Sequence, residues 1–220
     1  MRKLPCMTGV FVLAVAGPAF ADCAPEKLIR MVTQNVTPGI PADSFAVKPK
    51  VMYRLGNGRA RLEEQPDPVD GVHLLIITDA PRLWHIDLVS KTGETMVDDS
   101  TPPTVVLPVF SEEELPEEIR AVEYGCELQF MKDPATSHEI MKSGNGTKHS
   151  IRSGKWKFTI VTREGSDRPI AAMLSENDKV VGAIRYVAYQ TMESVPQGLF
   201  APPPGIVLKP ALSPETKGTY

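Results

Sequence analysis

His85 and Asp87 are the residues whose types and spacing come closest to catalytic chemistry. They stand two positions apart in the segment Leu83-Trp84-His85-Ile86-Asp87. In a β-strand, alternation puts both side chains on one face, where a carboxylate could orient an imidazole that acts as a general base. No nucleophile is positioned for them, since the sequence has no Gly-x-Ser-x-Gly motif. We therefore expect both at the rim of a half-exposed sheet, and a hydrolase built on them stays open only as an alternative.

The remaining motifs that could bind a nucleotide or a metal are incomplete. Gly56-Asn57-Gly58 is followed by Arg61, where a dinucleotide-binding loop needs its third glycine, and Lys155 is followed by Trp156, where a P-loop needs Ser or Thr. The four histidines have no spacing that would place two of them on one turn of a helix as metal ligands. The formal net charge of -3 gives no basic surface for nucleic acid. We expect no catalytic residues, no metal, no cofactor and no nucleic-acid partner.

The first 21 residues have the three parts of a secretory signal peptide. Met1-Arg2-Lys3 is positively charged, Met7 to Phe20 is apolar, and Ala19-Phe20-Ala21 gives the small-x-small pattern that signal peptidase reads. The apolar run is shorter than the roughly 18–20 residues that span a bilayer. The sequence thus predicts cleavage after Ala21 and export to a periplasm as a protein not integral to the membrane; its oligomeric state stays open.

Three stretches have the apolar spacing and capping residues of helices. Pro25 to Gln34 places Leu28, Met31 and Val32 on one stripe. In the middle of the chain, apolar residues from Ser111 to Phe130 recur at helical intervals, and Asp133-Pro134 opens a second helix that Ser143-Gly144 closes. The sequence predicts an N-terminal helix and a central helical pair.

Short alternating segments separated by turn residues fill the rest of the chain. Val51 to Leu55 leads into the hairpin signal Gly56-Asn57-Gly58, and Trp156, Phe158 and Ile160 alternate with polar neighbours. Further strands are expected at Val72–Thr78, Arg82–Leu88, Glu94–Val97, Pro169–Leu174, Val180–Tyr189 and Ile206–Leu208. Regular hairpin spacing favours an α+β fold: a curved antiparallel sheet, or half-barrel, with the helices covering its concave face. We expect one domain over residues 22–208 and a flexible tail over 209–220.

This arrangement resembles the periplasmic lipoprotein-carrier superfamily, the LolA/LolB-like fold, which includes sensor proteins related to RseB. The resemblance rests on the signal, on Leu83-Trp84-His85-Ile86-Asp87, on Ile184-Arg185-Tyr186-Val187-Ala188-Tyr189, and on Leu199-Phe200-Ala201-Pro202-Pro203-Pro204-Gly205-Ile206, which looks like the family's phenylalanine–proline–glycine ending. It covers most of residues 24–208. The carriers have a latching arginine in an early strand, a region that here holds Arg54, Arg59 and Arg61.

Two classes of function follow for such a sheet. The first is a non-enzymatic protein that binds an acyl chain, a lipid or a lipidated protein on the concave face; the alternatives are a structural or sensor protein of the envelope without ligand, and the hydrolase above. The side chains expected to line the apolar site are Trp84, Trp156, Phe158, Ile160, Met173 and Tyr186. An open apolar cavity favours binding, a filled core favours a structural role, and a polar cleft around His85 favours catalysis.

The cysteines give a prediction. Removal of the signal removes Cys6 and leaves Cys23 and Cys126, which we expect to form a disulfide in an oxidising compartment. Neither thiol of the exported protein should react with an alkylating reagent until a reductant is added, as mass spectrometry of the intact protein would show. Labelling of both thiols without reductant would contradict the pairing.

Overall fold

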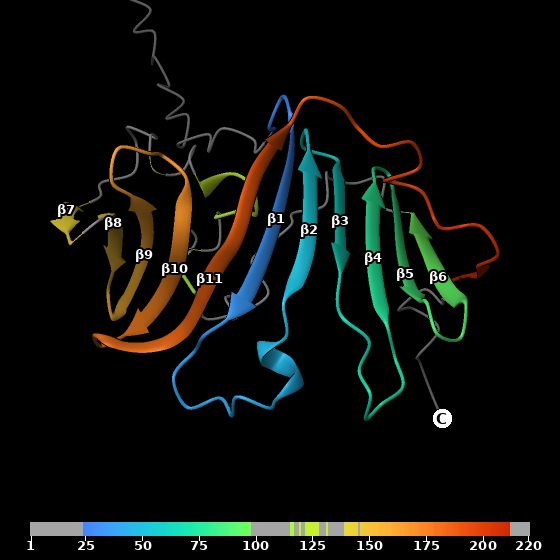
Figure 1. Cartoon of the computed structure of the whole chain (residues 1–220), viewed down its shortest axis with the longest axis horizontal. Coiled ribbons are helices and arrows are strands. Elements are labelled where there is room, and N and C mark those ends of the chain that lie inside the picture. Colours follow the sequence, from blue (N-terminus) through green and yellow to red (C-terminus); the bar gives the residue numbers. More distant parts are fainter. Residues whose placement is uncertain are drawn as a thin grey trace, which may run out of the picture.

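Twelve strands form a single open sheet in the computed structural model, which describes residues 24–97, 115–116, 119, 122–127, 131, 139–144 and 146–211. The strand order is β12-β6-β5-β4-β3-β2-β1-β11-β10-β9-β8-β7, so β12 and β7 are the two edges (Figure 1). All neighbours are antiparallel except β12, which runs parallel to β6. The N-terminal strand β1 lies in the middle of the sheet, between β2 and β11.

The strands have the following bounds: β1 Leu28–Asn35, β2 Lys50–Leu55, β3 Arg59–Glu63, β4 Leu74–Asp79, β5 Arg82–Asp87, β6 Thr92–Val97, β7 Glu139–Ser143, β8 Gly146–Ser153, β9 Trp156–Arg163, β10 Pro169–Glu176, β11 Lys179–Met192 and β12 Val207–Pro210. A single-turn 3-10 helix, η1 (Phe45–Val47), connects β1 to β2 and is the only helix to which the described residues give bounds. None of the helical residues described belongs to a helix long and apolar enough to cross a membrane.

The turns form where the sequence predicts them. β2 and β3 pair through Leu55 and Arg59 across Gly56-Asn57-Gly58, and Gly56 takes a φ of +61° that a side chain would disfavour. Asn177 and Asp178 both take positive φ values in the two-residue turn between β10 and β11, as a type I′ turn requires. The predicted strands from 51 to 97 and from 156 to 208 are confirmed to within a few residues.

The predicted helix over Pro25–Gln34 is wrong, because Leu28–Asn35 is strand β1. Leu28, Ile29 and Met31 are all buried, since β1 has strands on both sides and covered faces above and below. A strand that is buried on both faces does not alternate apolar with polar residues. Its continuous apolar run can therefore be mistaken for the apolar stripe of a helix. The end of the predicted second central helix is also wrong, because Glu139–Ser143 is the edge strand β7.

The sheet has two apolar faces, each with its own cover. We call inner face the one that bears Met31, Met52 and Phe158, and outer face the one that bears Leu75 and Trp84. The inner face is apolar over β8 to β11, β1 and β2, and it packs against described residues of the central segment 115–131. Those residues are Leu115, Ile119, Val122, Tyr124 and Met131. Apart from these residues and Glu139–Ser143, the predicted central helices lie outside the described residues. The expected helical cover is therefore not shown.

The outer face is apolar over β4 and β5, where Leu75, Ile77 and Ile86 are fully buried. Its cover is the C-terminal segment 193–208, which runs from the end of β11 to β12 and contributes Phe200 (Figure 1). Leu199, Ile206 and Leu208 pack beside it. The proline-rich closing motif is therefore the cover of the outer face, and β12 runs two residues past the predicted domain end at 208.

Two arginines of β3 help to hold the C-terminal cover in place, in addition to its apolar packing and the pairing of β12 with β6. The Arg61 Nη1 donates to the backbone oxygen of Leu199 at 3.3 Å, and the guanidinium of Arg59 lies over the Phe200 ring, 5.8 Å from its centroid. Both arginines come from β3, on the outer face.

We expect Phe200→Ala to lower the free energy of unfolding by about 3 kcal/mol, because it opens a cavity above Leu75 and Ile77. Urea unfolding followed by circular dichroism measures this. Val207→Ala is the matched control: Val207 belongs to the same segment but is exposed, and its loss should cost less than about 0.5 kcal/mol. Equal losses in the two variants would contradict the assigned role of Phe200.

Candidate functional site

The sheet is interrupted where β10 begins. Pairing between β10 and β11 begins at Ala171 and Arg185, whereas β11 continues to Met192 beside β1. Pro169, at the start of β10, has no N–H to donate to a neighbouring strand. A notch results between the β9–β10 turn and the second half of β11.

A β-bulge aims two tyrosines of β11 at the same face beside this notch. Val32 pairs with Ala188 and Thr33 with Tyr186, so Val187 is the extra residue. Strict alternation would put Tyr186 and Tyr189 on opposite faces, but the bulge brings both to the inner face. Their rings meet edge to face with centroids 5.9 Å apart.

Both tyrosine hydroxyls donate to one buried carboxylate of the central segment. The Tyr186 hydroxyl lies 2.6 Å from Oε1 of Glu127, and the Tyr189 hydroxyl lies 3.4 Å from Oε2. Glu127 has no exposed surface. Burial raises the pKa of its carboxyl above the usual 4.5, although the hydrogen bond from Tyr186 acts in the opposite direction. Burial, and then the Glu127 charge, raises the pKa of Tyr186 and Tyr189 as well.

Arg54 of β2 is a second polar anchor of the central segment. Its Nη2 donates to Oε2 of Glu123 at 2.8 Å, and its Nε donates to the backbone oxygen of Gly56 at 3.1 Å. Burial lowers the pKa of this guanidinium, and the charge of Glu123 opposes that shift. Gly125, with a φ of +82°, packs so closely on Arg54 that a Cβ there would lie 3.2 Å from the arginine's own Cβ. Of the three arginines of the early strands, Arg54 is thus the one that meets the central segment.

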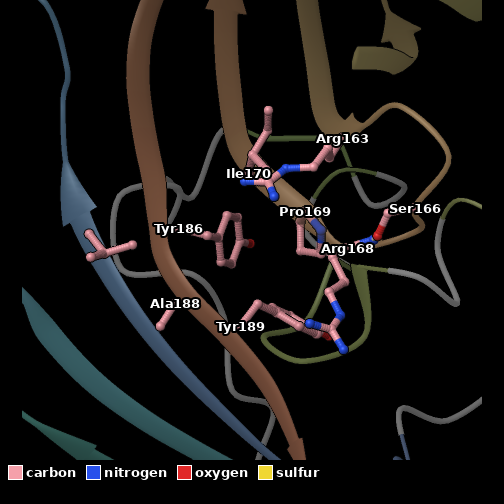
Figure 2. Close-up of a pocket in the computed structure, with 9 residues that line it drawn as sticks. Arg163, Ser166, Arg168, Pro169, Ile170, Tyr186, Ala188 and Tyr189 are labelled. Atoms are coloured by element: carbon pink, nitrogen blue, oxygen red, sulfur yellow. The ribbon is translucent and has the colours of Figure 1, made fainter. Parts of the chain in front are cut away.

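The notch holds a pocket of about 440 Å³. Its walls come from the β9–β10 turn and from β11 (Figure 2): Arg163, Ser166, Arg168, Pro169, Ile170, Tyr186, Val187, Ala188 and Tyr189. Tyrosines of the inner face and Ala188, which the alternation of β11 places on the outer face, both line it, so the pocket passes into the plane of the sheet. The lining presents more polar than apolar surface: the arginines of the turn give it positive charge, and the tyrosine rings and Ile170 give it an apolar part.

Four of the six predicted lining residues lie together on the inner face. Trp156, Phe158 and Ile160 form a packed core in which Phe158 and Ile160 have no exposed surface, and Tyr186 borders both that core and the pocket. The prediction that Trp84 shares this face is wrong. Trp84 pairs with Ile77 on the outer face and packs in the cluster under the C-terminal segment.

Met173 is also on the other face. Its neighbours Ala172 and Leu174 are buried in the inner cluster, and strand alternation turns Met173, which is only half-buried, away from them. A methionine suits an apolar lining, but the position of Met173 in β10 places its side chain on the face opposite to the inner cluster.

Sequence reasoning missed Glu127, Tyr189 and the two pocket arginines, Arg163 and Arg168. Glu127 resembles the other acidic residues of a strongly acidic stretch, and the two arginines stand in a turn with Glu164 and Asp167, as solvated turns often do. The spacing of Tyr186 and Tyr189 was the available signal. Two tyrosines three apart in a strand share a face only if a bulge lies between them.

His85 and Asp87 do not form a catalytic pair in the structure. Asp87 accepts hydrogen bonds from the backbone N–H groups of Val89 and Ser90, which close the turn after β5, and from that of His73, just before β4. These bonds, that from His73 foremost, hold the pKa of its carboxyl well below the usual range. The carboxylate is used in the turn, and the geometry gives the hydrolase alternative no support.

The described residues contain no group of three or more His, Cys, Asp or Glu side chains arranged to hold a metal ion. Cys126, between Gly125 and Glu127, is buried and disulfide-bonded. Cys23 lies outside the described residues, so the Cys23–Cys126 pairing stays a prediction.

Comparisons with known proteins find distant likenesses in structure. No family model and no curated protein matches the sequence. An uncharacterized conserved protein from Thermus thermophilus is similar at a TM-score of 0.46 and 10% identity, over 84% of this chain and 91% of that one. A LolA superfamily protein from Nitrosomonas europaea is similar at a TM-score of 0.35 and 9% identity, over 83% of this chain and 92% of that one.

We expect Glu127→Gln to change how stability depends on pH. Because the folded-state pKa is raised, Glu127 contributes most below its unfolded pKa, and its contribution falls as pH rises through the folded value. The variant lacks this loss. Its stability relative to wild type should therefore improve between about pH 4 and about pH 8, by about 1.4 kcal/mol per unit of pKa shift.

Urea unfolding of both proteins at the two pH values measures this, with the exposed Glu94→Gln as control. A stability difference between Glu127→Gln and wild type that stays constant or moves in the opposite direction would show that Glu127 is not held as described.

Proposed function

We propose that this chain is a non-enzymatic binding protein for an apolar ligand: an acyl chain, a lipid or a lipidated protein. The observation that carries the proposal is the pocket beside Tyr186 and Tyr189, because these two residues also belong to the inner apolar cluster. Its volume lies within the roughly 300–1,000 Å³ of small-molecule sites. We further propose that residues 1–21 direct the protein to the periplasm, where such ligands would be met.

The ligand's apolar chain lies against Ile170, Val187 and the tyrosine rings in this proposal, and it extends toward the inner face. Besides its apolar packing, the described part of the central segment makes polar contacts with that face: Arg54 with Glu123, Thr33 with Tyr124 at 2.7 Å, and the tyrosines with Glu127. Polar contacts fix the position of the segment, whereas the stabilisation from apolar packing grows with the apolar area that is buried. Displacement of the cover would uncover the aromatic floor of Phe158 and Trp156.

A structural or sensor role without ligand is the second candidate, and one observation favours it. Phe158 and Ile160 are completely buried and Trp156 nearly so, as expected for a filled core and not for a cavity wall. The two candidates differ in whether the pocket has an occupant.

We expect Ala188→Phe to weaken binding of a fluorescent dodecanoate analogue about tenfold, because a ring in the pocket displaces about two methylenes, each contributing roughly 0.8 kcal/mol. Fluorescence titration measures the affinity. Ala171→Phe is the matched control: Ala171 is half-buried on the neighbouring strand but does not line the pocket. His85→Ala should also leave the affinity unchanged.

A wild-type protein that binds no such probe at micromolar concentration would favour the structural candidate. Equal weakening by Ala188→Phe and Ala171→Phe would place the ligand elsewhere than in the pocket. Hydrolysis of an ester probe that His85→Ala abolishes would restore the enzymatic alternative.

A further inference from the structure

The pocket contains two arginines whose guanidinium groups have no hydrogen-bond or ion-pair partner among the described residues. They are Arg163, at the end of β9, and Arg168, just before β10. Other exposed arginines of this part of the sheet are engaged: Arg152 with Asp178, and Arg185 with Gln34. The two positive charges at the pocket are therefore not neutralised by the fold as described.

The β9–β10 turn fixes both arginines by its backbone. Arg163 N–H donates to the oxygen of Arg168 at 3.4 Å, and Ser166 N–H donates to the oxygen of Arg163 at 3.0 Å. Arg168 N–H donates to Oγ of Ser166 at 3.1 Å, which leaves the serine hydroxyl hydrogen to donate elsewhere. Figure 2 shows both arginine side chains extending from the turn toward the tyrosine rings of β11.

Among the described residues, no carboxylate lines the pocket. Glu164 and Asp167 belong to the same turn but are not among the lining residues. Behind the wall, the tyrosine hydroxyls bind the buried carboxyl of Glu127. Its raised pKa favours the neutral form, so it opposes a negative ligand less than an exposed carboxylate would.

We infer that the pocket recognises the anionic head group of an amphipathic ligand, a phosphate or a carboxylate, through Arg163, Arg168 and the hydroxyl of Ser166. Guanidinium groups suit this task because their planar donors bind two oxygens of such a group at once. The tyrosine rings and Ile170 meet the cationic turn within one cavity, which matches a molecule with an acidic head and an apolar chain. This inference rests on the proposed function and adds the chemistry of the head.

The test compares ligands that differ only in the head. Isothermal titration calorimetry with monomeric dodecyl phosphate, with dodecanol and with inorganic phosphate should give the tightest binding for dodecyl phosphate. The double variant Arg163→Gln/Arg168→Gln should bind dodecyl phosphate about tenfold or more weakly and dodecanol unchanged. The matched control is Arg82→Gln, since Arg82 is an exposed arginine of β5 on the other half of the sheet.

The outcomes separate the two proposals. If wild type binds dodecanol and dodecyl phosphate equally, or if the double variant keeps its affinity for dodecyl phosphate, the head-group inference is overturned while the proposed function stands. If wild type binds neither compound, the proposed function is overturned. Equal affinity for inorganic phosphate and dodecyl phosphate would identify a free anion as the ligand and overturn the assignment to a head group. Circular dichroism of the double variant checks that both substitutions, at exposed positions, leave the fold intact.

Discussion

The rest of the structure depends on one constraint: the buried apolar surface changes sides within a single sheet. Over β8 to β11 it is the inner face that is buried, and over β4 and β5 it is the outer face. In the middle strands both faces are buried, as Met52 and Leu55 of β2 show. Because an apolar face must be covered, one cover cannot serve both halves. The chain uses the central segment 115–131 on one side and the segment 193–208 on the other.

The two covers are held by different physics. The C-terminal cover inserts Phe200 into a cluster of aliphatic side chains, where the stabilisation follows the area buried. The central cover adds polar pairs inside the apolar region, above all Arg54 with Glu123 and Tyr186 with Glu127. The cost of desolvation offsets much of the electrostatic free energy of such pairs. They therefore determine the position of the segment more than they add to its stability.

Local features of the sequence predicted most of the sheet, and features set by distant strands did not appear in it. The hairpin at Gly56 and the alternation of Trp156, Phe158 and Ile160 depend on neighbours in the chain, and both were predictable. Which face Trp84 occupies depends on register carried across β4, β3 and β2 to β1. A one-residue shift in any of those pairings would reverse it. β1 was predicted as a helix because its burial on both sides comes from strands far away in the sequence.

The pocket follows from two local departures from regular pairing, and it needs both. The notch would be filled if the first residues of β10 also paired with β11. Pro169 has no N–H to donate, and the pairing begins only at Ala171. Without the extra residue Val187, Tyr189 would point to the outer face and could not share Glu127 with Tyr186. A sheet defect beside a β-bulge thus places two tyrosine rings and two arginines around one cavity. Regular strand pairing would have given a closed surface there, so the irregularity itself is what opens a pocket in an otherwise continuous sheet.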